Sequence, residues 1–109
     1  MNAETITNPT DHLSFKERLG RCYELSGLIV LHNPDTCLVH GSIQGLGNPR
    51  LAHAWVDLPD GSVWEPATNK VWSRYTFTAF FKPRVTRKYA NRCAIDHFVR
   101  HETYGPWES

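Results

Sequence analysis

The sequence predicts an α+β fold, in which an N-terminal helix packs on a small antiparallel sheet and a C-terminal helix covers that sheet. Apolar residues recur with the helical period between residues 13 and 32, the spacing changes to the strand period of two after residue 37, and a helical pattern returns near the C-terminus. The 109 residues are 40% hydrophobic and 21% charged, which is typical of a single globular domain. We therefore expect a flexible arm over residues 1–12 and one domain over residues 13–109.

A capping box marks the first helix. Ser14 and Glu17 have the S-x-x-E spacing in which each side chain binds the backbone amide of the other residue, so a helix is expected directly after Ser14. A second helical pattern runs over residues 21–32 and ends before Pro34, because proline disfavours helical backbone in the residue that precedes it. Cys22 is therefore expected at or near a helix N-terminus.

Strands are predicted in the middle of the chain, where apolar and polar residues alternate. The first is expected at residues 37–43 and ends in a glycine-rich turn at residues 45–49, and the second runs over residues 51–58. Pro59-Asp60-Gly61 then favours a hairpin, with residues 62–67 as the returning strand.

The last third of the chain is predicted to contain further strand and one helix. Residues 71–81 are rich in aromatic and β-branched residues, which favours one or two more strands. Residues 86–102 have a helical pattern whose buried candidates are Tyr89, Cys93, Phe98 and Val99. The five Lys and Arg residues between Lys82 and Arg92 would be spread around that helix, so we interpret them as solvated. The alternative, nucleic-acid binding through this segment, predicts a steep salt dependence.

Composition and charge exclude several functional classes. The net charge of +1 argues against a nucleic-acid partner, and no apolar stretch approaches the roughly 20 residues of a membrane-spanning helix. The N-terminal residues lack the pattern of a signal peptide, so we expect a cytoplasmic protein without a membrane partner. The three cysteines have no C-x-x-C spacing, which indicates reduced thiols and neither a metal site nor another cofactor. The oligomeric state stays open.

Cys22 is the first candidate for chemistry. Unpaired amide groups and the helix dipole stabilise a thiolate at a helix N-terminus, and the neighbouring guanidinium of Arg21 is expected to favour it further. The backbone amide of Cys22 is also a natural hydrogen-bond donor to an oxyanion. The alternative interpretation is a buried structural cysteine, because free cysteines are often small core residues.

His53 is the candidate general base. It shares one face of the second strand with Trp55, so a helix that starts beside this strand would meet the imidazole, and Trp55 is placed to cover the site. His40, on the preceding strand, is a further candidate for a base or for a polar wall of the site. An ordinary core or strand histidine is the alternative interpretation of each.

Three residues compete to orient the His53 imidazole. Asp57 lies on the same strand about 13 Å away, which is beyond hydrogen-bond reach. If the Pro-Asp-Gly turn is a three-residue hairpin loop, Trp55 opposes Glu65, and Glu65 is a diagonal neighbour on the His53 face. A two-residue loop would shift the register by one and turn Glu65 to the other face. Asn69, on the opposite diagonal, is the fallback.

Two short runs carry a resemblance to a known family. Residues 53–57 are His-Ala-Trp-Val-Asp, and after a glycine-containing turn residues 64–68 are Trp-Glu-Pro-Ala-Thr. The pair is similar to the bacterial transglutaminase-like pattern H-A-W-V-E, turn, W-x-x-x-D-P-T. The resemblance implies a papain-like or transglutaminase-like minimal core, with Cys22 as nucleophile, His53 as base and Glu65 in the place of the family aspartate.

The resulting hypothesis is a cysteine-dependent acyl-transfer enzyme that acts on a peptide or protein amide. Protease or amidase, deamidase and transglutaminase-like outcomes are all compatible with the three residues. The residues expected to support the substrate or the oxyanion are Arg21, Trp55, His40 and Asn69. The alternative is a catalytically inactive binding module or inhibitor with the same fold, which the short chain and the Glu-for-Asp change favour. The small size is compatible with a bacterial or phage source.

Overall fold

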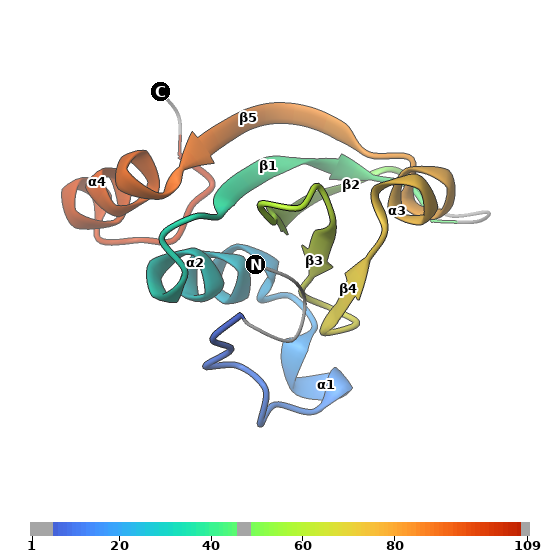
Figure 1. Cartoon of the computed structure of the whole chain (residues 1–109), viewed down its shortest axis with the longest axis horizontal. Coiled ribbons are helices and arrows are strands. Elements are labelled where there is room, and N and C mark those ends of the chain that lie inside the picture. The colour runs from blue at the N-terminus through green and yellow to red at the C-terminus, as the bar shows by residue number, and fades with distance from the viewer. Residues whose placement is uncertain (1–5, 46–48, 108–109) are drawn as a thin grey trace.

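The computed structural model describes residues 6–45 and 49–107, and this part of the chain folds into four helices and a five-stranded antiparallel sheet (Figure 1). The predicted α+β class is confirmed. Residues 46–48 of the expected glycine-rich turn and residues 1–5 of the expected arm lie outside the described residues. Within the described residues, no helix is long and apolar enough to cross a bilayer. In chain order the elements are α1 (Phe15–Arg18), α2 (Cys22–His32), β1 (Cys37–Ile43), β2 (Leu51–Asp57), β3 (Val63–Glu65), β4 (Lys70–Trp72), α3 (Arg74–Phe81), β5 (Arg84–Ala90) and α4 (Asn91–His101).

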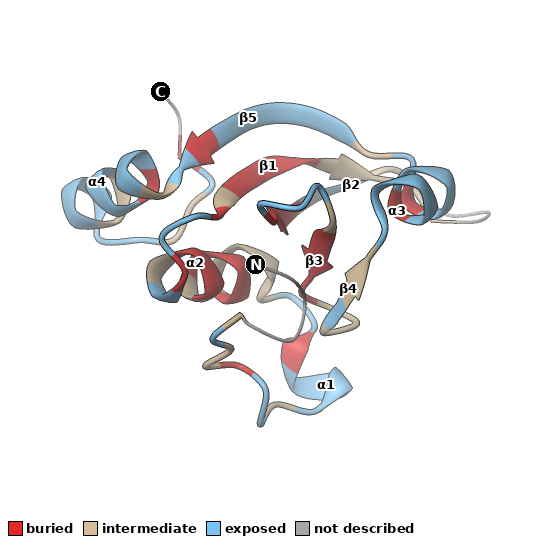
Figure 2. Cartoon of the chain, in the orientation of Figure 1, coloured by how far each residue is buried: buried red, intermediate tan, exposed pale blue. Residues whose placement is uncertain are grey.

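The sheet separates two hydrophobic clusters. Its strand order is β4-β3-β2-β1-β5, and each pair of neighbours is antiparallel. Successive residues of a strand point to opposite faces, so Val56 packs in one cluster with Leu25 and Ile29 of α2, whereas Trp55 packs in the other with Phe77 of α3. Figure 2 shows most of the buried residues on α2, β1 and β3, in the middle of the molecule, whereas α4 and most of β5 are exposed. Strand β2 therefore lies between two packed layers.

The hairpin between β2 and β3 has the register expected of a three-residue loop. Leu58 N donates to Ser62 O at 2.9 Å and Gly61 N donates to Leu58 O at 3.0 Å. Gly61 has a φ of +89°, in the left-handed region that glycine tolerates. The next pair along the strands is Asp57 with Val63, so the same register continues into β2 and β3. The predicted turn is confirmed.

The prediction of strands over residues 71–81 is wrong for most of that segment. Only its first residues belong to β4, and the helix α3 follows directly. Ser73 is the N-cap of that helix, because its Oγ accepts a hydrogen bond from Thr76 N at 3.1 Å. The buried aromatic residues are Phe77 and Phe81, four residues apart, which is helical spacing. The high β-propensity of the segment masked this cap.

The prediction of a helix over residues 86–102 is wrong for its first five residues. They belong to β5, which pairs with β1 and places Tyr89 opposite Leu38 in the core. The helix α4 begins only at residue 91, so Cys93 is exposed and Val99 is 74% exposed. Phe98 packs partly against the core. Tertiary pairing with β1 therefore overrides the local helical pattern.

The described part of the expected arm, residues 6–12, makes specific polar contacts with the rest of the chain. Thr7 N donates to Asn33 Oδ1 at 2.8 Å, and Asn33 Nδ2 donates to Thr7 O at the same distance. Asn8 Nδ2 donates to Asn69 Oδ1 at 2.8 Å. Polar contacts of this kind produce no hydrophobic periodicity in the sequence. The sequence pattern therefore predicts only a loose segment.

Replacement of Gly41 by alanine is expected to destabilise the fold. A Cβ at this position would lie 2.0 Å from the carbonyl oxygen of Arg84, where a bulge brings β1 close to β5. Because the obstacle is backbone, the strand pairing has to shift, and we expect the free energy of unfolding in urea to fall by about 2–4 kcal/mol. In the control Gly61→Ala the new Cβ has no atom within 4 Å, so only the strain of a left-handed backbone remains. We expect that strain to lower the free energy of unfolding by about 1–2 kcal/mol. Equal losses would contradict the packing argument.

Candidate active site

The hairpin brings His53 of β2 and Glu65 of β3 into direct contact. His53 Nε2 lies 2.7 Å from Glu65 Oε2. The Glu65 side chain is 1% exposed and that of His53 is 12% exposed, so water is largely excluded from this pair. A carboxylate can only accept, so Nε2 donates its proton to Glu65 and the other ring nitrogen, Nδ1, is left for a second partner. Glu65 is the orienting residue that the expected register selects.

The Glu65 carboxylate is held by three further donors from its own turn. Ala67 N donates to Oε2 at 3.0 Å, and Thr68 donates to Oε1 through its backbone amide at 2.7 Å and its hydroxyl at 2.8 Å. Trp72 Nε1 lies 3.1 Å from Thr68 Oγ1. An indole N–H can only donate, so Thr68 accepts from Trp72 and directs its own proton to Glu65. Neither Thr68 nor Trp72 is among the site residues expected from the sequence.

The charges of His53 and Glu65 shift each other's pKa. Burial lowers the pKa of His53, but hydrogen bonds to Cys22 and Glu65 and the charge of Glu65 outweigh it and raise the pKa to about 9. Burial raises the pKa of Glu65, but the hydrogen bond and charge of His53, with the amides of Thr68 and Ala67, hold the pKa below its ordinary value. At neutral pH the pair is an imidazolium and a carboxylate.

Cys22 is the first residue of α2 and shares a cavity with His53. The cavity has a volume of about 380 Å³, and its other walls are Arg18, Leu19, Gly20, Ile43, Leu51, Ala52 and Ala67. The interaction with Cys22 contributes to the raised pKa of His53, and Nδ1 is the ring nitrogen left to donate to the sulfur because Nε2 is bound to Glu65. The N-cap residue, Arg21, makes no side-chain hydrogen bond to the helix start. The amides of the first turn of α2 are therefore open to an anionic ligand.

Two of the four residues expected to support the site are engaged elsewhere. The Arg21 guanidinium forms two hydrogen bonds of 3.0 Å with the carboxylate of Glu24. Asn69 accepts from Trp64 Nε1 at 3.2 Å and donates to Asp11 Oδ1 at 2.9 Å, so it anchors the N-terminal segment. Neither side chain lies on the cavity wall. Of the two candidates for orienting His53, Glu65 and Asn69, it is therefore Glu65 that does so.

The other two expected residues lie in aromatic surroundings. The Trp55 ring is buried and stacks at 6.4 Å from the His53 ring, which is the neighbour expected from the strand pattern. His40 lies outside the cavity wall, with its ring 4.8 Å from Tyr23 and 5.1 Å from Trp107. Burial and then the charge of His97 lower the pKa of His40 to about 4, so this ring is neutral at neutral pH.

Arg18 is a site residue that the sequence analysis missed. It is buried, and its guanidinium donates to Leu13 O at 3.2 Å, to both Thr10 oxygens and to Pro66 O at 3.2 Å. It therefore ties the N-terminal segment and α1 to the turn that begins at Glu65. The contacts join residues up to 48 positions apart, so no local pattern could have revealed them.

Comparisons with protein-family models, curated proteins and solved structures find no match to this chain. Within the described residues, no group of three or more His, Cys, Asp or Glu side chains is placed to hold a metal ion.

Loss of the Thr68 hydroxyl is expected to raise the pKa of Glu65. The isosteric Thr68→Val variant removes one donor to the buried carboxylate, and a hydrogen bond to a charged group is worth about 1.5–3 kcal/mol, or roughly one to two pKa units. The measurement is a ¹³C NMR titration of the glutamate carboxyl groups. Thr68→Ser, which keeps the hydroxyl, should titrate like the wild type. An unchanged pKa in Thr68→Val would contradict this role.

Titration of His53 is expected to depend on the charge of Glu65. In an NMR titration the His53 ring should lose its proton near pH 9, and in Glu65→Gln the midpoint should fall toward the ordinary value of 6.5, because the charge of Glu65 no longer offsets burial of the imidazolium. The raised pKa favours the folded state by roughly 3 kcal/mol below pH 6.5, and this contribution is lost as the pH rises through 9. The alkaline loss of stability should therefore be smaller in Glu65→Gln. An equal midpoint in both proteins would disprove the coupling.

Proposed function

We propose that this chain is a cysteine-dependent acyl-transfer enzyme that acts on a peptide or protein amide. The observation that carries the proposal is the 2.7 Å contact between His53 Nε2 and Glu65 Oε2, in a site where His53 and Cys22 line the same cavity. A carboxylate that orients an imidazole, whose other nitrogen meets a thiol, is the arrangement that activates a cysteine nucleophile. The papain-like or transglutaminase-like resemblance agrees with the same three residues.

The first half-reaction uses the charge state of the resting site. Cys22 attacks as the thiolate with the imidazolium of His53 as its counter-ion, and the sulfur forms a C–S bond to the amide carbonyl carbon. Backbone amides in the first turn of α2 donate to the resulting oxyanion. His53 Nδ1 then gives its proton to the leaving amine, the C–N bond breaks, and a thioester to Cys22 remains.

The second half-reaction releases the acyl group. Neutral His53 takes a proton from the attacking molecule, whose oxygen or nitrogen forms the new bond to the acyl carbon as the Cys22 thiolate leaves. Glu65 holds the ring in place and stabilises the imidazolium that forms again. Water as the attacking molecule gives hydrolysis or deamidation, and a second amine gives transfer.

The size and lining of the cavity favour a small peptide segment as the substrate. Its volume lies near the lower end of the range for ligand sites, and Leu19 and Leu51 form apolar walls that are each more than half exposed. A peptide side chain would cover this apolar surface while its carbonyl meets Cys22. The glutamate in the place of a family aspartate fits its setting, because the longer side chain also reaches the amides of Ala67 and Thr68.

The proposal predicts that Cys22 reacts faster with iodoacetamide than an ordinary exposed thiol of the same molecule. Cys93 on α4 is exposed and serves as that reference. At pH 6 we expect the Cys22 rate to exceed the Cys93 rate by about tenfold or more, because Cys22 begins a helix and shares its cavity with the imidazolium of His53. Peptide mass spectrometry after timed alkylation gives both rates from one sample.

The variant His53→Ala should bring the ratio of the two rates close to one without changing Cys93. His97→Ala is the matched control, since this histidine lies on α4 and outside the cavity wall, and it should leave the Cys22 rate unchanged. A wild-type ratio near one at pH 6, or a Cys22 rate that is insensitive to His53→Ala, would refute the enzyme proposal.

A further inference from the structure

Positive charge is concentrated in one third of the chain, although the whole sequence is close to neutral. Residues 66–95 contain seven of the twelve Lys and Arg residues and none of the eleven Asp and Glu residues. The net charge of +1 for the whole chain, which led us to expect no nucleic-acid partner, conceals this separation. Local charge of one sign creates a field that attracts a polyanion regardless of the total.

Six of these seven cations lie on or between the consecutive elements β4, α3 and β5, and the seventh, Arg92, is on α4. Because residues 84–90 are a strand at the edge of the sheet and not part of a helix, their cations are presented along that edge. The carboxylate of Asp57 already binds Arg74 and Lys88, each at 2.9 Å. Among the described ion pairs, no carboxylate neutralises Arg84 or Lys70, and both are exposed.

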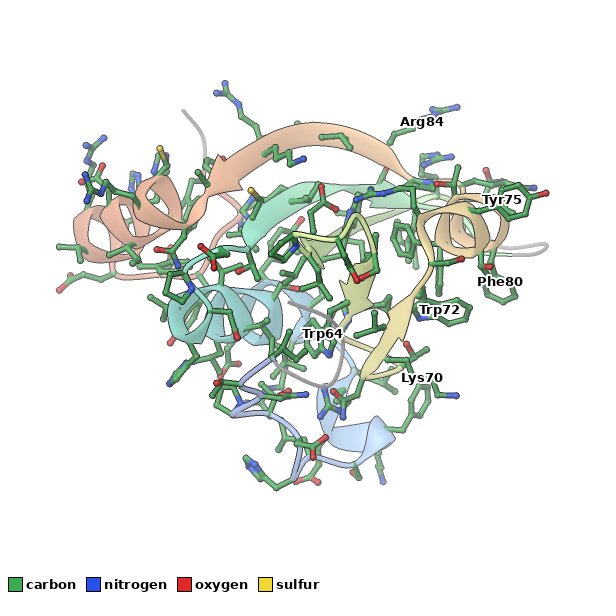
Figure 3. The ribbon with its side chains drawn as sticks, viewed as in Figure 1. Trp64, Lys70, Trp72, Tyr75, Phe80 and Arg84 are labelled. Atoms are coloured by element: carbon green, nitrogen blue, oxygen red, sulfur yellow. The ribbon has the colours of Figure 1, made fainter. Side chains whose placement is uncertain are left out.

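Exposed aromatic rings lie between these cations. Tyr75 is 84% exposed and Phe80 is 45% exposed, both on α3. The Phe80 ring is stacked on Trp72 of β4, with ring centroids 5.7 Å apart and planes at 25°. Figure 3 shows Arg84, Tyr75, Phe80, Trp72 and Lys70 following one another along one side of the molecule. We call these five residues the aromatic–basic surface.

We propose that the aromatic–basic surface binds single-stranded nucleic acid. Cations contact a phosphate backbone without regard to sequence, and flat aromatic side chains stack on unpaired bases, so a row of aromatic rings between two cations suits a single strand. An acidic peptide would use the cations but would leave Tyr75 and Phe80 without a matching group. A duplex hides its base faces and would likewise not use the rings.

The probes are fluorescein-labelled dT20 and rU20, titrated with the full chain and followed by fluorescence anisotropy at several salt concentrations. We expect both to bind at 20 mM NaCl with a steep loss of affinity as salt rises, and a 20 base-pair duplex to bind more weakly. A preference for rU20 over dT20 would identify RNA, and the reverse preference DNA, as the natural form of the same ligand.

Two variants separate the contributions of charge and stacking. Arg84→Glu should weaken dT20 binding by about threefold to thirtyfold and flatten the salt dependence, whereas Lys16→Glu, the same charge change on exposed α1, should have little effect. Tyr75→Ala should weaken binding by about fivefold to a hundredfold while the salt dependence stays as it is. Tyr75 is exposed, so its replacement leaves the core intact, which far-ultraviolet circular dichroism checks.

Three results would overturn the proposal. They are absence of dT20 and rU20 binding at 20 mM NaCl, equal losses in Lys16→Glu and Arg84→Glu, and binding of poly-glutamate as tight as that of dT20 with no effect of Tyr75→Ala. The last result would assign the surface to acidic proteins. Cys22→Ala should bind both oligonucleotides like the wild type, so the outcome is independent of the cysteine chemistry.

Discussion

The burial of the Glu65 carboxylate is the constraint on which the rest of the site depends. A buried charge is costly unless each of its oxygens is hydrogen-bonded and an opposite charge is near. Here His53 supplies the charge, and Ala67 and Thr68 supply the remaining donors. Arg18 binds the carbonyl of Pro66 and so fixes the turn that presents those donors. The imidazole, the turn and the N-terminal segment are therefore held by one network.

The position of that carboxylate follows from a single turn. Because side chains alternate across a strand, one residue more or less in the hairpin would move Glu65 to the other face of β3 and away from His53. The left-handed backbone of Gly61 sets the three-residue loop. Glutamate then suits the diagonal position, since it spans the offset to His53 and still reaches the amides that follow it in the chain.

The parts that could be predicted from the sequence are those with a local physical signal. The capping box at Ser14, the Pro-Asp-Gly turn and the alternation around His53 each involve neighbours in the chain, and the structure has all three. The predicted element is wrong for residues 74–81 and 86–90, because in the first segment a serine cap and in the second pairing with β1 prevail over local propensity. The long-range polar contacts of Arg18 and the aromatic contacts of His40 leave no periodic pattern in the sequence.

Trp72 belongs to both the Glu65 network and the aromatic–basic surface. Its indole N–H fixes the direction of the Thr68 hydroxyl, while its ring supports Phe80. Removal of Trp72 would therefore disturb the carboxylate and the stacking surface together, and the two effects could not be separated. Tyr75 has no such second role, since it is exposed and outside the Glu65 network. A ligand that orders the Trp72 and Phe80 rings would act on the candidate active site through the Thr68 hydroxyl alone. Coupling between the two sites therefore requires that Thr68 has a second arrangement, which the ligand disfavours.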